Sequence, residues 1–191
     1  MQFEMTLEPP PLGVKAVLGA PVYDTDEDAK AGSMLAQICD AFRDVHVRFF
    51  VRTGSGGHWP VDVWADLLAC IEQLHDAMAA LRTGRSPEWG DKAVLHFHDQ
   101  GLQCKVSLVR NGGLVVVDVR PDIVGIGISE ERYALPARVV VDELTQLAEK
   151  FVKIAVLVWP ALTQDPVFGG WSRDLVNESR ALLKALEEEE A

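Results

Sequence analysis

One short stretch of the chain carries residues that could bind a transition metal. His96 and His98 are two positions apart, and Asp99 and Cys104 follow closely. Alternate side chains of an extended strand share a face, so the two imidazoles would lie about 7 Å apart. Imidazole, thiolate and carboxylate are all ligands that transition metals accept. These residues therefore define one hypothesis, a metal-dependent enzyme or sensor centred on His96 and His98.

The turn after this strand decides whether Cys104 can join the histidines. A two-residue turn at 100–101 would pair Phe97 with Cys104 and place the thiol on the opposite face of the hairpin. A three-residue turn would pair His96 with Cys104 instead, and the spacing leaves both open. The alternation of His96, Phe97 and His98 is also explained without a metal, by a strand that turns Phe97 inward and both histidines toward solvent. We therefore expect no metal at His96 and His98.

Other short motifs lack parts that their chemistry requires. The glycine-rich segment 53–57 is followed by His-Trp-Pro and not by the Gly-Lys-Ser/Thr of a phosphate-binding loop. Gly125 and Gly127 lack the third glycine and following helix of a dinucleotide site. The acids of residues 24–28 begin like a calcium loop but have no closing glutamate, and no Gly-x-Ser-x-Gly sequence occurs. These patterns favour a protein that is not an enzyme and needs no cofactor.

The charge of the chain points to a protein partner. Twenty-nine Asp and Glu residues face 18 Lys and Arg, which gives a net charge of −11 spread along 191 residues. Phosphate groups and anionic membrane surfaces attract basic proteins, so we expect neither nucleic acid nor a membrane as partner. An acidic surface accelerates the encounter with a basic one. We therefore expect a protein partner with a basic contact surface.

Two regions are the candidates for that contact. The first is the acidic run that would precede a helix, and the second is the polar side of a helix predicted over 61–82, together with a nearby loop tryptophan. Tryptophans in Gly- and Pro-containing loops, such as Trp59, Trp89 and Trp171, either cap a core or anchor an interface. The candidate contact residues are Asp24, Asp26, Glu27, Asp28, Trp59, Asp66, Glu72 and Asp76.

The elements that would position these residues indicate an α+β fold, an antiparallel β-meander with amphipathic helices packed against it. Strand-like runs at 93–98, 102–109 and 114–119 are separated by short connectors that contain glycine. Helical spacing over 61–82 predicts a helix on the apolar face of the meander. Its predicted apolar stripe comprises Trp64, Leu67, Leu68, Ile71, Leu74, Met78 and Leu81.

Hydrophobic periodicity also predicts the remaining elements of a single domain over 1–191. The alternation of Phe3, Met5 and Leu7 is typical of a half-buried strand. The four acids at 187–190 repel one another at the negative end of a helix dipole, which predicts a frayed end. Further strands are expected at 12–18, 45–52 and 124–128. One helix is expected to carry Met34, Leu35, Ile38 and Phe42 on one face, and another is expected at 174–189. A helix is also expected at 140–158, and it would start either at Asp142 or at the step from Pro136 to Ala137.

Cysteine usage and hydropathy indicate a cytoplasmic protein. Cys39, Cys70 and Cys104 are odd in number and form no Cys-x-x-Cys pair, which argues against a disulfide scaffold or a zinc site. The first two lie within apolar helical patterns and are expected in the core. The first residues do not resemble a signal peptide, and the apolar stretch 151–162 is interrupted and too short for a membrane span.

Over Val45–Val158 the predicted elements follow one another as a strand, a long helix, a three-stranded meander and another helix. In this order and in its acidic charge, the chain resembles the small acidic bacterial immunity proteins of toxin–immunity systems. The Ala- and Val-rich, Lys-poor composition is also typical of a GC-rich bacterium. The resemblance implies an inhibitor that blocks a cognate toxin by surface contact. The chain is similar as well to secretion chaperones, which are usually dimers and hold effector segments on hydrophobic grooves. The sequence leaves the oligomeric state open.

Overall fold

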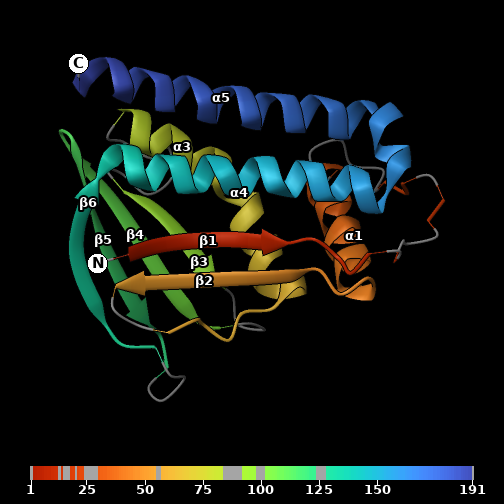
Figure 1. Cartoon of the computed structure of the whole chain (residues 1–191), viewed down its shortest axis with the longest axis horizontal. Coiled ribbons are helices and arrows are strands. Elements are labelled where there is room, and N and C mark those ends of the chain that lie inside the picture. Colours follow the sequence, from red (N-terminus) through yellow and green to blue (C-terminus); the bar gives the residue numbers. More distant parts are fainter. Residues whose placement is uncertain are drawn as a thin grey trace.

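The computed structural model describes residues 2–12, 14, 18–19, 21–23, 30–54, 57–83, 92–97, 102–123 and 128–190. These residues form an α+β fold of helices and two antiparallel sheets, which confirms the predicted class (Figure 1). The larger sheet lies at one end of the molecule and helix α1 (Lys30–Asp44) lies at the other. The predicted run at 24–28 and the loop tryptophan Trp89 lie outside the described residues.

The larger sheet contains the predicted meander. Its described strands are β3 (Ala93–Phe97), β4 (Cys104–Asn111), β5 (Leu114–Pro121) and β6 (Glu131–Pro136). They pair in the order β3-β4-β5-β6, and every pair is antiparallel. The first three match the predicted strands within a few residues, whereas β6 was not predicted. Most of the strand expected at 124–128 lies outside the described residues, and Ile128 itself precedes β6.

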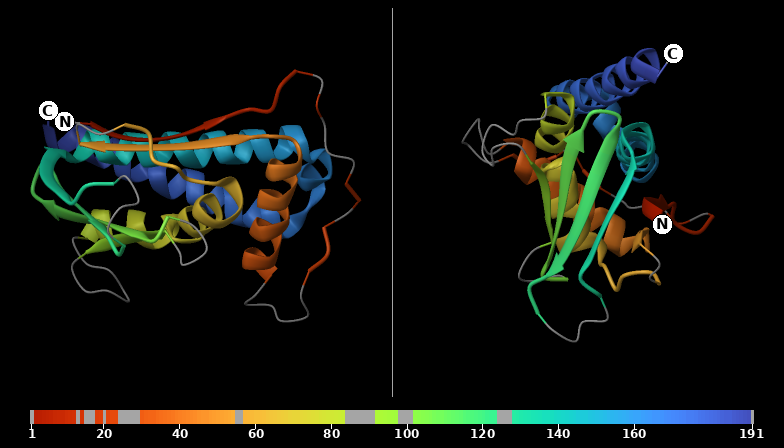
Figure 2. Two further views of the ribbon diagram at one scale, coloured as in Figure 1. Left: turned by 90° about the horizontal axis from the view of Figure 1, so that it is seen from below. Right: turned by 90° about the vertical axis from the view of Figure 1, so that its left-hand side faces the viewer.

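A smaller ribbon of β1 (Gln2–Glu8) and β2 (Arg48–Gly54) runs along one side of the molecule (Figure 2). Phe3, Met5 and Leu7 are buried opposite Thr53, Val51 and Phe49, so the predicted alternation is confirmed. The prediction of a strand at 12–18 is wrong for the residues of that segment that the structure describes, because none of them pairs with another strand.

The helix expected over 61–82 is interrupted. It consists of a π-helical turn η1 (Val63–Leu67), helix α2 (Leu68–Glu72) and helix α3 (Leu74–Thr83). The interruption is at Gln73, whose side-chain amide donates to the carbonyl of His96 at 3.0 Å and accepts from the backbone N–H of His96 at 2.8 Å. Gln73 thereby satisfies the backbone at the outer edge of β3, where an unpaired strand would otherwise attract another chain.

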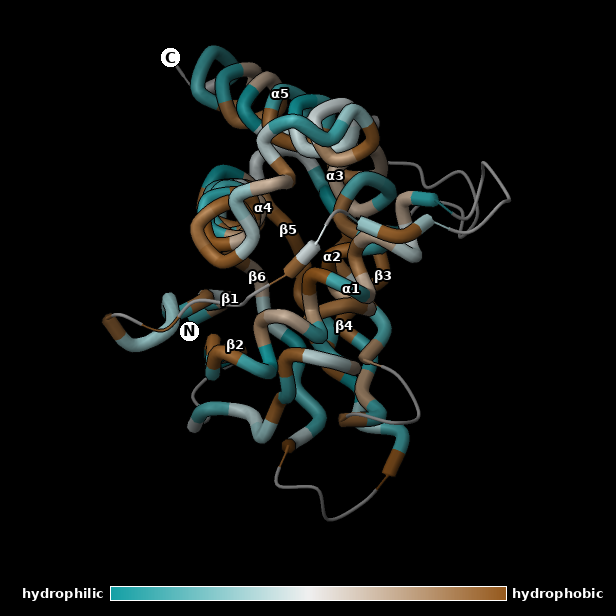
Figure 3. The backbone as a smooth tube through the Cα atoms, turned by 90° about the vertical axis from the view of Figure 1, so that its right-hand side faces the viewer, coloured by the Kyte–Doolittle hydropathy of each residue, from teal (hydrophilic) through white to brown (hydrophobic). Residues whose placement is uncertain are grey.

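Helix α4 (Ala137–Val158) lies at the centre of the fold. It packs against β1 on one side and against helix α5 (Pro166–Glu190) on another, as the end-on view of Figure 3 shows. Of the two predicted starts, the step from Pro136 to Ala137 is confirmed. A 3-10 turn η2 (Pro160–Gln164) separates α4 from α5.

The expected start of the C-terminal helix is wrong. Helix α5 begins at Pro166, eight residues before the predicted start, so Trp171 lies in a helix and its ring centroid is 5.7 Å from that of Phe151. The helix extends through the acidic residues to Glu190, and the fraying of this end stays a prediction. Glu187 pairs with Arg138 of α4 at 3.2 Å, and Glu189 pairs with Arg110 of β4. These cations offset the repulsion between neighbouring acids.

The core contains the predicted apolar residues of the helices and strands, with two exceptions. Cys39, Cys70 and Cys104 are buried free thiols, and Met34, Leu35, Ile38 and Phe42 of α1 are buried. Leu68 is only half-buried, and Trp64 is exposed. The predicted packing of the 61–82 helix on the meander is confirmed, because α2 and α3 both contact β3.

Replacing Ile71 by alanine should lower the free energy of unfolding by about 2–5 kcal/mol, because the side chain is fully buried between helix and sheet and its loss leaves a cavity. Urea unfolding followed by circular dichroism measures the change. Leu157→Ala is the control, since Leu157 is 54% exposed on α4. Its effect should stay within about 0.5 kcal/mol. Equal midpoints for the two variants would contradict the core position of Ile71.

Candidate functional site

Carboxylates of helix α1, of helix α2 and of the residue that caps η1 are close enough to act on one buried thiol. Burial raises the pKa of Cys39, and the charges of Glu72, Asp40 and Asp62 raise it further. Helix α1 and helix α2 approach closely here, since a Cβ added at Gly32 would lie 3.4 Å from Oε1 of Glu72. We call Asp40, Asp44, Asp62 and Glu72 the acidic surface.

Local structure fixes the position of Asp62. Its Oδ1 accepts a hydrogen bond from the backbone N–H of Ala65 at 2.6 Å, which caps the first turn of η1. A carboxylate is favourable there, because the first N–H groups of a helix have no internal partner. The acid is therefore both a helix cap and a charge on the surface.

Trp64 is an exposed aromatic residue next to this cap. It is 38% exposed, although the sequence predicted it in the core. The prediction is wrong because η1 is π-helical, so the period of 3.6 residues does not apply to it. Val63, Asp66 and Leu67 take the buried positions of the turn instead. The π-helical turn has no clear sequence signal, so this surface residue was missed.

Asp66 is not a surface contact residue, contrary to expectation. It is 1% exposed. Its Oδ1 accepts from the N–H of Leu102 at 2.9 Å, and its Oδ2 accepts from the N–H of Asp62 at 2.9 Å. The carboxylate thus connects η1 to the segment before β4, because Leu102 lies 36 residues after Asp66 in the chain.

Trp59 caps the core and does not lie on an open surface. It is 7% exposed, and its ring meets the ring of Phe97 edge-on at 5.5 Å. Of the other candidate contact residues, Glu72 and Asp76 are exposed on α2 and α3. Asp24, Asp26, Glu27 and Asp28 lie outside the described residues, so their role stays a prediction.

The hairpin register separates Cys104 from the histidine beside it. Phe97 pairs with Cys104, so the thiol shares the buried face of Phe97. His96 pairs with Lys105 on the other face and is half-buried. His98 and Asp99 lie outside the described residues. Among the residues that the structure does describe, no three His, Cys, Asp or Glu side chains are placed to hold a metal ion together.

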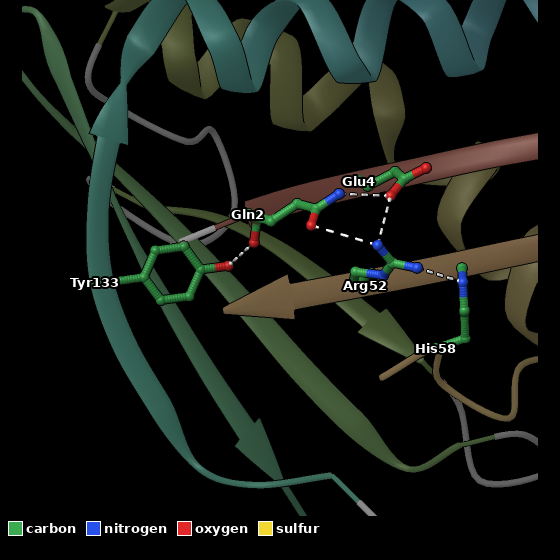
Figure 4. A network of polar contacts seen from close by, with 5 residues as sticks. All are labelled: Gln2, Glu4, Arg52, His58 and Tyr133. Atoms are coloured by element: carbon green, nitrogen blue, oxygen red, sulfur yellow. Dashed lines mark hydrogen bonds and ion pairs between the residues drawn. The ribbon is translucent and has the colours of Figure 1, made fainter. Parts of the chain in front are cut away.

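A polar network joins the two sheets at the N-terminal end of β1 (Figure 4). The hydroxyl of Tyr133 on β6 donates to the carbonyl of Gln2 at 2.9 Å and accepts from the N–H of Gly54 at 3.0 Å. Arg52 lies 3.9 Å from Glu4 across the ribbon and also contacts His58. The arginine is thus engaged within the ribbon, and the network positions β1 and β2 against β6.

Comparison of the chain with protein-family models, with curated proteins and with solved structures finds no match. In the described part of the chain, no helix combines the length and apolarity that crossing a membrane requires. Function must therefore be argued from the surface itself.

Purified protein should contain no stoichiometric transition metal, because Cys104 points away from the face of His96. Metal analysis by plasma mass spectrometry tests this expectation. A stoichiometric zinc or nickel content that disappears in the His96→Ala/His98→Ala variant would contradict it.

Gly54→Ala should destabilise the protein more than Gly112→Ala. The two glycines have φ of +60° and +59°, so both variants carry the strain of a left-handed residue, about 1–2 kcal/mol. Only at Gly54 would the new Cβ overlap the carboxylate of Glu131, which should add roughly 1 kcal/mol through a displaced half-buried charge. Urea unfolding measures both variants.

The Glu131→Ala background isolates that additional cost in a double-mutant cycle. There the costs of Gly54→Ala and Gly112→Ala should become equal. An excess cost at Gly54 that persists without the Glu131 side chain would show that the carboxylate is not its cause.

Proposed function

We propose that this protein is a non-enzymatic binding module that inhibits a cognate protein by contact, as bacterial immunity proteins do. The acidic surface would meet a basic surface of the partner, with Trp64 as the apolar anchor. The observation that carries the proposal is the exposed indole of Trp64 two residues after the helix-capping carboxylate of Asp62. Tryptophan is among the residues that contribute most to binding energy at protein interfaces.

The distribution of paired charges supports this location. Away from α1, several basic side chains are engaged with acids in ion pairs, such as Arg110 with Glu189 and Arg180 with Glu149. Within residues 30–44 and 57–72, Lys30 and Arg43 are the only Lys or Arg residues. Acids therefore outnumber bases where α1 packs against η1 and α2. The negative potential of these acids would steer a basic partner toward Trp64.

A secretion chaperone or adaptor is the second candidate, and one observation favours it. Several apolar residues before α1 are exposed, among them Leu12 at 105% and Val22 at 75%. Exposed apolar side chains could hold an unfolded segment of another protein. A chaperone of this type would be a dimer, so sedimentation equilibrium separates the two candidates.

The partner can be captured from a lysate of the source cells on immobilised protein, identified by mass spectrometry and then prepared in pure form. Association should slow as salt rises, because the Debye length falls from about 10 Å at 0.1 M to about 3 Å at 1 M. Dissociation should change much less. Capture of nucleic acid alone, or an association rate indifferent to salt, would contradict the proposal.

Charge reversal then locates the contact. Glu72→Lys should slow association about tenfold at low salt. The matched control is Glu188→Lys, the same change at a side chain 70% exposed near the far end of α5, and it should have less than about a twofold effect. Trp64→Ala should accelerate dissociation and weaken binding by roughly 2–4 kcal/mol. Equal effects of the two reversals would show that the acidic surface is not the contact.

A further inference from the structure

Part of the chain before α1 is fixed against the body of the protein by two side chains. The indole N–H of Trp159, at the end of α4, donates to the carbonyl of Gly19 at 2.8 Å. The amide of Gln37 on α1 accepts from the N–H of Val22 and donates to its carbonyl. We call the described residues 18–19 and 21–23 the strap. Figure 2 shows this part of the chain on the outside of the molecule near α1.

A cavity of about 200 Å³ lies between the strap, α1 and the end of α4. Its lining residues are Leu18, Gly19, Gln37, Asp40, Ala41, Asp44 and Trp159. Sites for cofactors and drug-sized ligands usually occupy roughly 300–1,000 Å³. This cavity is smaller, so a single side chain fits its size better than a cofactor does.

The cavity combines apolar walls with two carboxylates. Leu18, Ala41 and Trp159 supply the apolar part. Asp40 and Asp44 are one helical turn apart on α1, and their side chains are 46% and 69% exposed. Gln37 is already engaged in holding the strap, so the carboxylates are the groups that can meet a ligand.

Arg43 partly neutralises these carboxylates from outside the cavity. Its guanidinium lies 2.9 Å from Asp40 and 3.9 Å from Asp44, and its side chain is 58% exposed. Exposed ion pairs of this kind contribute only about 0.2–1 kcal/mol. A cation that enters the cavity would gain both carboxylates and the apolar walls, so Arg43 does not prevent its binding.

We propose that this cavity receives one arginine side chain of the partner protein, an inference that rests on the proposed function. An arginine has an apolar stem that can lie along Leu18 and the Trp159 ring, and a planar cation that carboxylates bind through two hydrogen bonds. Guanidinium is also more weakly hydrated than ammonium and so enters a partly apolar site more readily. The cavity thus selects a basic partner by shape, in addition to the attraction of the acidic surface.

N-acetyl-arginine amide is the probe, observed by ¹⁵N–¹H correlation NMR of the full chain. The indole N–H signal of Trp159 and the amide signal of Gly19 should shift in a saturable way at millimolar probe. N-acetyl-citrulline amide, which has the same shape without the charge, should produce no such shift. The Asp40→Asn/Asp44→Asn variant should bind the arginine probe at least about fivefold more weakly. Glu130→Gln/Glu188→Gln removes the same charge at exposed side chains outside the cavity and the acidic surface, and should keep the wild-type affinity.

Equal shifts with the citrulline probe, tighter binding of N-acetyl-lysine amide, or no effect of Asp40→Asn/Asp44→Asn would each overturn the arginine site. Binding measurements with the purified partner distinguish a failure of the cavity proposal from a failure of the proposed function. If the partner dissociates from wild type and from the Asp40→Asn/Asp44→Asn variant at equal rates, while Trp64→Ala still accelerates dissociation, the cavity proposal alone is overturned. If no protein partner is captured, the proposed function fails, and the cavity proposal fails with it whatever the probe does.

Discussion

The packing of helix α4 is the interaction on which the rest of the structure depends. Its residues Leu144, Leu147 and Phe151 are fully buried, and the helix contacts β1, α5 and the larger sheet. Polar atoms of α4 also cover the outer edge of β1, because Glu143 accepts from the N–H of Met5 and Lys150 donates to the hydroxyl of Thr6 at 2.6 Å. A two-stranded ribbon alone is marginal in water, so β1 and β2 owe their stability to this helix.

Because α4 spans the molecule (Figure 1), its two ends hold different parts of the structure in place. Its first turn follows β6 directly and fixes the larger sheet, since the N–H of Ala137 donates to the carbonyl of Gly113 at 2.8 Å. Its last residue is followed by Trp159, which holds the strap beside α1. The cavity and the acidic surface therefore take most of their residues from helices, which would limit the entropy lost on binding of the proposed partner.

Sequence reasoning succeeded where one period runs through a whole element and failed where a local departure or a distant partner decides. The alternation of Phe3, Met5 and Leu7 and the helical spacing over α4 predicted these elements correctly. The π-helical turn reversed the prediction for Trp64. Asp66 is buried because of the N–H of Leu102, which no local pattern reveals. The start of α5 was hidden by Gly169 and Gly170, residues that usually weaken a helix.

In the proposed binding function, charge alone would give little selectivity, because any basic surface is attracted to an acidic one. Screening leaves steering effective only over about 10 Å at 0.1 M salt, so charge acts mainly on the rate of encounter. Selectivity requires features that act on contact, and the exposed indole of Trp64 and the cavity beside Trp159 are of that kind. Helix α1 connects them, since it packs against η1, which carries Trp64, and also lines the cavity. A partner that fits both would meet two anchors at a fixed separation, which a merely basic protein would not match.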